Sequence, residues 1–278
     1  MLDHELSIEG RPATMGNLYL EELSLPLIKQ IRDKRLKTYQ ENGKAGYSQC
    51  NREVSALSSA VQWALQQFDE VKVNPFRGLR ALTEPKRTRY VTDAEYDAQY
   101  AQAIASAYVY LPVVFELAYL LSCRGAEVCD LKIADTELTD NAGNPIIKVP
   151  RRKGSKTTHI AQTPRLRLAV ADALALHKFY GVESCLWLVP SSKGGKLNKV
   201  TIDTAMQRLK RQMSDAGLIS THTYEGGKDD AEKPLYWTLH DLKRKGISDA
   251  SDARIGGHRS AAMRERYDTK VEVFEAPA

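Results

Sequence analysis

The chain has 278 residues, of which 42% are hydrophobic and 27% charged, an ordinary balance for a soluble globular protein of about two domains. Its net charge of +5 permits a polyanionic partner without requiring one. The sequence contains no apolar run of about 18 residues and no basic and then apolar segment at its start, so neither a membrane span nor a secretory signal is predicted.

The cysteines indicate the compartment of the protein, and the basic clusters indicate the kind of partner it binds. No two cysteines form a Cys-x-x-Cys pair, which predicts reduced thiols of a soluble intracellular protein at Cys50, Cys123, Cys129 and Cys185. Lysines and arginines gather at 151–156, 208–211 and 243–245. This placement, more than the modest net charge, favours an anionic partner.

The N-terminal part begins with 23 residues of little pattern. Residues 24–40 then predict an amphipathic helix that opens at Ser24 or Leu25, with Pro26 tolerated in its first turn. Its cations either face phosphates or are plain solvated charge, and the sequence leaves both readings open for Lys34, Arg35 and Lys37.

A second helix and a linker complete this part. Residues 51–68 repeat apolar side chains at helical spacing, with small residues that let another helix approach. Residues 74–91 hold two prolines and five cations, a composition that predicts a linker along nucleic acid and a domain boundary near residue 85. The next helix opens with a capping box formed by Thr92 and Glu95.

A long apolar helix is predicted for residues 106–123, and Pro112 is expected to kink or restart it. Arg124 follows directly, and an arginine beside a buried helix needs a partner or a ligand for its charged head. Glu127 is close enough to hold it, so a purely structural ion pair and a ligand-binding arginine are both open.

Residues 146–162 predict a β-hairpin whose turn is centred on Gly154. Lys153 and Lys156 lie at its tip, where a flexible amine can enter a groove, although an exposed basic hairpin is the simpler alternative. The segment GSKT is not a nucleotide-binding phosphate loop, because it lacks the required glycine spacing.

The rest of the chain predicts more helix than strand. A helix over 163–180 has Thr163 as its N-cap, followed by a proline. A short strand is expected at 185–189, a helix at 201–217, and a further helix with Thr238 as a plausible N-cap.

The stretch from His240 to Tyr267 holds two histidines, a dense set of cations and one tyrosine. A phenol with basic and imidazole neighbours indicates a nucleophile whose target is an anion, because its developing charge needs stabilisation. A helix with solvated charges is the alternative.

Taken together, these pieces resemble the tyrosine recombinases, specifically the phage-type integrases. The resemblance covers roughly residues 50–270 and rests on five motifs in order: an arginine after a buried helix (LLSCRGAEVCDL), a lysine on a hairpin turn (RKGSK), HDLK, GGH, and a tyrosine nine residues beyond that histidine. It implies a mainly α fold with a small antiparallel β-sheet, in which a helical core DNA-binding domain (1–85) precedes a mixed α+β catalytic domain (86–278).

The resemblance implies a role for each site residue. Tyr267 would attack a DNA phosphate and form a 3′-phosphotyrosyl link, and Arg124 would bind the phosphate oxygens. Lys153 would protonate the leaving 5′-oxygen, with Lys156 as the fallback. His240 and His258 would donate hydrogen bonds or assist proton transfer. Glu127 would orient the cluster from behind, and neither a metal nor a cofactor is expected.

Two departures from the family stand out. The family's His-x-x-Arg is here His-x-x-Lys243, and lysine keeps the charge but loses the bidentate geometry. Arg244 follows, but one helical step of about 100° is expected to turn it away from that face. The 18 residues between His240 and His258 are also a short separation, which a trimmed connection would explain.

The resemblance also implies partners and a compartment. It predicts double-stranded DNA with attachment-type sites, a homotetramer on synapsed DNA, accessory DNA-bending or directionality factors, and a place in the cytoplasm or nucleoid of a bacterial host. The first helix looks short or missing and the N-terminus truncated, and the tail 268–278 either docks on a neighbouring subunit or is disordered. A type IB topoisomerase-like enzyme and a catalytically weakened DNA-binding protein remain the alternatives.

Overall fold

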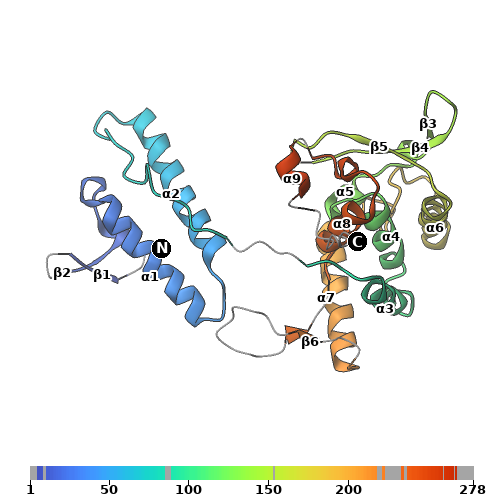
Figure 1. Cartoon of the computed structure of the whole chain (residues 1–278), viewed down its shortest axis with the longest axis horizontal. Helices are drawn as coiled ribbons and strands as arrows, with labels where there is room; N and C mark the ends of the chain where they lie inside the picture. The colour runs from blue at the N-terminus through green and yellow to red at the C-terminus, as the bar shows by residue number, and fades with distance from the viewer. Residues whose placement is uncertain are drawn as a thin grey trace, which may run out of the picture. The chain divides into compact units, whose positions relative to one another are not determined.

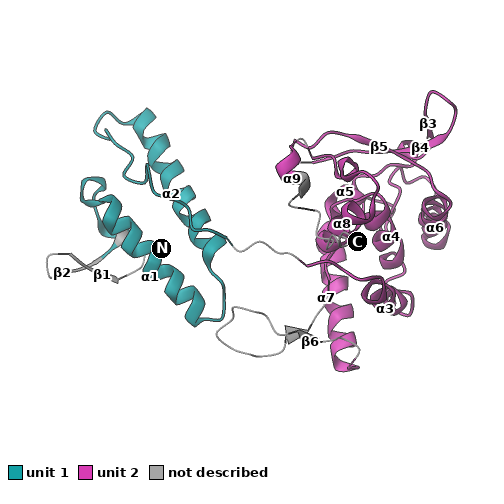
Figure 2. Cartoon of the chain, in the orientation of Figure 1, with its two compact units in different colours: residues 1–87 teal, residues 88–278 magenta. Residues whose placement is uncertain are grey.

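A computed structural model describes residues 5–8, 11–84, 89–152, 154–217, 221–222, 233–234, 237–258, 260–265 and 267. The chain divides into two compact units, residues 1–87 and 88–278 (Figure 2). None of the helices in the described residues combines the length and the apolar composition that crossing a membrane requires.

The first unit is built on two helices, α1 (Leu25–Glu41) and α2 (Tyr47–Gln67). The start of α1 is as predicted, because the Ser24 hydroxyl accepts the N–H of Leu27 and a proline lies in the first turn. A hairpin of β1 (Glu5–Ile8) and β2 (Arg11–Thr14) precedes the helices and was not predicted. A small core joins them, formed by Leu23, Ile28, Ile31, Val61 and Phe76.

The cations of α1 are at least partly structural. The guanidinium of Arg35 donates to Glu53 of α2 at 3.2 and 3.3 Å and to the Tyr39 hydroxyl at 3.1 Å. Lys37 lies 3.9 Å from Glu41 on its own helix, with both side chains exposed. Arg35 is therefore not a plain solvated charge, because its guanidinium ties α1 to α2.

The second unit packs its helices around α4 (Leu111–Leu120), which is buried along most of its length. The helices α6 (Pro164–Tyr180) and α8 (Leu239–Asp249) pack directly against it (Figure 1). Less extensive contacts with α4 come from α3 (Asp93–Ile104), α5 (Gly125–Cys129) and α7 (Lys199–Asp215). As predicted, Thr92 and Glu95 form the capping box of α3, and Thr163 caps α6.

The apolar helix predicted for residues 106–123 is shorter than expected. Residues 106–110 form bends and a turn instead. Pro112 has no N–H to donate within a helix, so it is accommodated in the first turn of α4 and marks its start. At the other end Ser122 adopts a positive φ of 47°, which ends the helix and sends the chain toward Arg124.

A three-stranded antiparallel sheet covers one edge of this unit, in the order β3 (Leu138–Thr139), β4 (Pro145–Val149) and β5 (Thr158–Ala161). The predicted hairpin is confirmed as β4 and β5, and β3 is an addition that was not predicted. The strand expected at 185–189 is wrong. Only isolated bridges form there, between Lys132 and Trp187 and between Pro190 and Lys196.

Candidate active site

Four of the other five predicted site residues converge on Tyr267, whose side chain is largely buried at 9% exposure. The ring centroid of His258 lies 4.2 Å from that of Tyr267, and the His240 ring lies 5.5 Å away, edge-on. The Lys243 ammonium is 5.9 Å from the same ring centre. Arg124 completes the group, because its guanidinium lies close enough to Tyr267 to interact with it electrostatically.

These residues come from four separate segments of the second unit. Arg124 is the N-cap of α5, while His240 and Lys243 project from α8. His258 follows a short 3-10 turn (Ala253–Gly256), and Tyr267 lies just beyond α9 (Ala261–Glu265) (Figure 1). Because α8 packs on α4, the fold brings the histidines to the arginine that ends the α4 region.

Glu127 holds the arginine of the site. Its carboxylate accepts from the Arg124 guanidinium at 2.5 Å and from the Arg124 backbone N–H at 2.9 Å. The contact expected between these two residues is therefore present. The Arg124 side chain nevertheless stays 18% exposed, so its guanidinium can still meet a ligand.

The same carboxylate gathers three cations in the interior. In addition to its contact with Arg124, the Glu127 carboxylate lies 3.4 Å from the Arg151 guanidinium and 3.6 Å from the Lys243 ammonium. The side chains of Glu127, Arg151 and Lys243 are fully buried. Burial alone would raise the pKa of Glu127, but Lys243 and the N–H donors of Arg124 and Arg152 lower it to about 2. The carboxylate is therefore ionised at any physiological pH.

Lys243 lies deeper than a surface cation of a binding groove would. Its side chain is fully buried, and its ammonium donates to the Gly256 carbonyl at 3.3 Å. Burial lowers the pKa of Lys243 to about 8, against the opposing attraction of Glu127. The ammonium is mostly charged at neutral pH and loses its charge in mildly alkaline solution.

Arg244 belongs to the site, and the expectation that it faces away was wrong. Its guanidinium carbon lies 5.7 Å from the Tyr267 ring centre, and only 7% of the residue is exposed. The helical step does separate it from Lys243. However, the face of an aromatic ring attracts cations, and the phenol ring is wide enough for both Lys243 and Arg244 to approach it.

Arg151 is a site residue that the sequence reasoning counted only as part of a basic cluster. Its buried guanidinium donates to the carbonyls of Leu121, Ser122 and Ile255 at 2.6–2.9 Å. It therefore fastens the hairpin to the end of α4 and to the turn that precedes His258. An arginine directly after a predicted strand, before the lysines of the hairpin turn, was the one available signal.

Both histidines are neutral at pH 7. Burial and the charges of Lys243 and Arg124 lower the pKa of His258 to about 4. His240 is exposed at one edge, but the atoms crowding its imidazole and the charge of Arg244 also lower its pKa to about 4. Each ring can therefore accept one proton or donate one N–H, and neither is an imidazolium acid.

Lys153, the sixth predicted residue, lies outside the described residues. Its fallback, Lys156, has an exposed side chain, and its backbone N–H donates to the Gly257 carbonyl at 3.0 Å. That bond joins the β4–β5 loop to the residue before His258. Among the described residues, no three His, Cys, Asp or Glu side chains are grouped as metal ligands would be.

The arrangement suits an oxyanion held beside a phenol. Arg124, Lys243 and Arg244 supply fixed positive charge around Tyr267, and two neutral imidazoles flank the ring. Preorganised cations and N–H donors of this kind stabilise charge that develops in a transition state. A nucleophilic phenol attacking an anion is the chemistry that such a set supports.

No protein-family model and no curated protein matches this sequence. Solved structures do. A lambda integrase dimer bound to a COC′ core site is 20% identical, with a TM-score of 0.66 over 98% of this chain and 70% of that one. A lambda integrase tetramer bound to a Holliday junction is 18% identical, with a TM-score of 0.66 over 97% of this chain and 70% of that one.

A Tn1549 transposon integrase in complex with circular intermediate DNA is 18% identical, with a TM-score of 0.64 over 93% of this chain and 85% of that one. At this level of identity the likeness shows the fold. It confirms the predicted fold class, mainly helical with one small antiparallel sheet.

Proposed function

We propose that this chain, which has the fold of the tyrosine recombinases, is a site-specific DNA recombinase that cleaves and rejoins DNA through Tyr267. The observation that carries the proposal is the phenol of Tyr267, which interacts with Arg124 and is flanked by two neutral imidazoles among buried cations. Because the solved structures of similar fold are integrases on DNA, duplex DNA is the substrate class that fits.

In the cleavage step, the Tyr267 oxygen bonds to the phosphorus of a backbone phosphate and the bond to the 5′-oxygen breaks. The products are a 3′-phosphotyrosine and a free 5′-hydroxyl, and the reverse attack by a 5′-hydroxyl rejoins the strand. The guanidinium of Arg124 fits two non-bridging oxygens with its parallel donors. Lys243 and Arg244 balance the additional negative charge of the transition state.

The protons are divided between two kinds of residue. The phenol proton passes to a neutral imidazole, for which His240 and His258 are both placed beside the ring. Since neither histidine is an imidazolium at neutral pH, the proton for the leaving 5′-oxygen comes from a lysine. Lys153 on the β4–β5 loop is our candidate for that acid, and Lys156 is the alternative.

Recombination requires more than one copy of the chain. Two duplexes must be cut and exchanged, and we infer a tetramer on synapsed DNA because lambda integrase, of similar fold, forms one on a Holliday junction. In this proposal residues 1–87 form the helical domain that holds the DNA together with the catalytic unit. Attachment-type sites and accessory DNA-bending or directionality factors belong to the same proposal.

Trapping of a covalent complex tests the proposal. A duplex selected from a random pool by binding to this protein would be nicked at successive positions, so that cleavage releases a short strand and cannot be reversed. We expect a protein–DNA adduct that resists denaturation with the wild type and none with Tyr267→Phe. No adduct from the wild type, or an adduct that persists in Tyr267→Phe, would overturn the proposal.

The same assay separates the alternatives. A catalytically weakened DNA-binding protein would bind the selected duplex and form no adduct. A type IB topoisomerase-like enzyme would form the adduct, and it would relax supercoiled plasmid without joining two separate duplexes. Recombinant products from two labelled duplexes, together with the adduct, are the outcome that we expect.

A further inference from the structure

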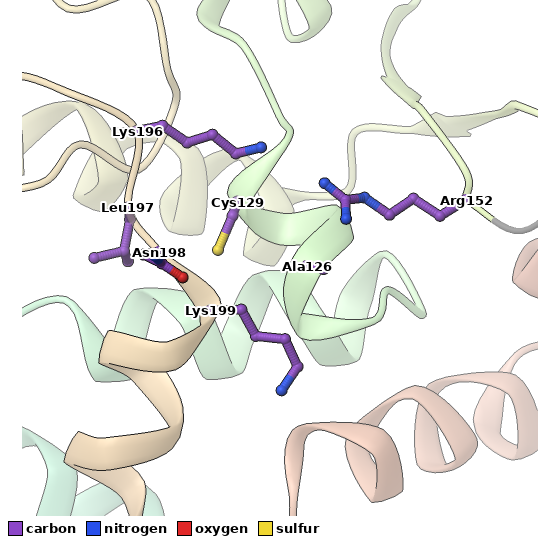
Figure 3. Close-up of a pocket in the computed structure, with 7 residues that line it drawn as sticks. All are labelled: Ala126, Cys129, Arg152, Lys196, Leu197, Asn198 and Lys199. Atoms are coloured by element: carbon purple, nitrogen blue, oxygen red, sulfur yellow. The ribbon is translucent and has the colours of Figure 1, made fainter.

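A basic pocket lies on the far side of α5 from Glu127, with a volume of about 340 Å³. Figure 3 shows Arg152 and Lys196 reaching toward each other across α5, while Lys199 extends from the start of α7 below them. The floor is formed by small or apolar atoms of Ala126 and Cys129. Three cations therefore line one cavity beside α5.

Asp130 keeps two of these cations in place. The Arg152 guanidinium donates to both carboxylate oxygens of Asp130, one of them at 2.9 Å, and the Lys196 ammonium also donates to it. Lys196 lies in addition 5.0 Å from the Trp187 ring centre. Because the side chains of Arg152 and Lys196 remain 50% and 34% exposed, these ion pairs are weak enough for a second anion to join or replace the carboxylate.

The third cation, Lys199, lies at the N-terminus of a long helix. Lys199 is the first residue of α7, which runs for 17 residues, and Asn198 caps it by accepting the N–H of Val200. A helix start carries partial positive charge and attracts anions, and here it lies beside three side-chain cations. The pocket therefore combines two independent sources of positive potential.

The pocket and the active site share their supports. Arg152 donates its backbone N–H to Glu127, whose same oxygen receives the Arg124 guanidinium. Ala126 and Cys129 of the pocket belong to the five-residue helix that Arg124 caps. The pocket and Arg124 are thus linked through Glu127 and α5.

We propose that this pocket binds a second phosphate of the DNA backbone, near the phosphate that Tyr267 attacks, through Arg152, Lys196 and Lys199. The proposal rests on the proposed function for the identity of the DNA. Its physical role is to fix the register of the strand, since phosphate contacts position a duplex without reading its sequence. While DNA is absent, Asp130 holds Arg152 and Lys196 in place and Asp203 pairs with Lys199.

A scan with neutral phosphates tests this site. The probe is the selected duplex carrying a single methylphosphonate, which removes one backbone charge, at each position around the cleavage point. Binding is measured on the Tyr267→Phe background, so that the result does not depend on cleavage. We expect the double variant Arg152→Gln, Lys196→Gln to reduce the slope of log K against log salt concentration by about 1, which is the contribution of one phosphate.

The scan then locates that phosphate. One methylphosphonate position should weaken binding several-fold with the parent protein and have no effect with the double variant. The control is Arg167→Gln, an exposed cation of α6, which should leave every position unchanged. If the double variant keeps the parent's salt dependence and the parent's methylphosphonate profile, the pocket binds no DNA phosphate, whatever the adduct assay shows. If the double variant loses both the steeper salt dependence and the sensitivity to the methylphosphonate, but the wild type forms no adduct, only the proposed function is overturned.

Discussion

The charges at the centre of this site are held by one buried carboxylate. Glu127 accepts hydrogen bonds from Arg124 and lies within 3.6 Å of the ammonium of Lys243. A buried cation without such a partner would shed its proton or destabilise the fold, because its loss of hydration is not compensated. At the residue scale, therefore, the catalytic cations and the stability of the unit depend on the same interactions.

Lys243 gives the site a pH dependence that an arginine would not. Its pKa is about 8, so its charge is present below that pH and lost above it. If the ammonium stabilises the transition state, the rate of adduct formation at subsaturating DNA should fall as pH rises through about 8. In Lys243→Arg the fall should move to higher pH, since guanidinium stays charged.

The measurement is a pH series of single-turnover adduct formation, from pH 6.5 to 9.5 for both proteins, a range chosen roughly two units around the lysine pKa. Lys243→Met, which removes the charge, should lower the rate by about 10² to 10³-fold below pH 8, as loss of one stabilising donor does. The difference from the wild type should narrow above pH 8, where the wild-type lysine loses its own charge. A flat wild-type profile across this range would show that the charge of Lys243 is not used.

Glu127 predicts how the fold responds to acid. Its folded pKa of about 2 is below its ordinary value of 4.5, so it stabilises the folded state above pH 4.5. That contribution, on the order of 3 kcal/mol, is lost as pH falls toward 2. Glu127→Gln should therefore be less stable than the wild type at pH 7, and the difference should shrink on acidification.

Urea unfolding of both proteins between about pH 7 and 3 checks this. Glu183→Gln, at an exposed position with no partner role in the site, is the matched control and should follow the wild type throughout. A constant gap between Glu127→Gln and the wild type at all pH values would contradict the assignment of the low pKa.

At the scale of elements, α8 is the part that assembles the site. It carries His240, Lys243 and Arg244, and it is fastened to the rest of the unit by Lys245. That buried lysine donates to Asp93 of α3 at 2.6 Å and lies 3.0 Å from Asp249 on its own helix. Lys245 therefore ties α8 to the start of α3.

Gly246 sets the distance between α8 and α4. A Cβ atom at this position would lie 2.2 Å from the Tyr119 carbonyl oxygen and 2.7 Å from the Ser122 hydroxyl. Gly246→Ala must push the helices apart, and we expect a loss of about 1–3 kcal/mol in unfolding free energy. Adduct formation should also slow, because the displaced helix carries three of the residues around Tyr267.

Thermal and urea unfolding measure the stability effect. Gly195→Ala is the control, since a Cβ there would meet only the Ser191 hydroxyl at an ordinary 3.6 Å. A Gly246→Ala protein as stable as this control would mean that α8 does not pack as closely on α4 as the structure has it.

At the scale of the whole molecule, the two units have separate cores. The second unit contains a continuous apolar core around α4, and the first has its own smaller one. The site residues that the structure describes all belong to the second unit. We therefore propose that the chemistry and part of the DNA binding belong to different units.

Residues 89–278 alone should unfold in one cooperative transition, since they keep the larger core intact. Their affinity for the selected duplex should be lower than that of the full chain, with a shallower salt dependence, because phosphate contacts of residues 1–87 are lost. Fluorescence anisotropy at several salt concentrations measures both. Equal salt slopes for the fragment and the full chain would show that the first unit does not contact the backbone.

Local chemistry in the sequence determined several elements and most of the site. The caps at Ser24, Thr92 and Thr163 predicted helix starts, because a side-chain oxygen satisfies the first free N–H groups wherever it occurs. The order of Arg124, His240, His258 and Tyr267 predicted the phosphate chemistry, since each residue type has a chemical role of its own.

What the sequence could not decide were the relations between segments distant in the chain. Periodicity extended the α4 helix too far and proposed a strand at 185–189, because apolar runs fit either a helix or a buried strand until packing selects one. The contact of Arg244 with Tyr267 and the anchoring role of Arg151 depend on how α8 and the β4–β5 loop meet. Only the tertiary structure brings those segments together, and with them the buried charges that set the pKa values of Glu127 and Lys243.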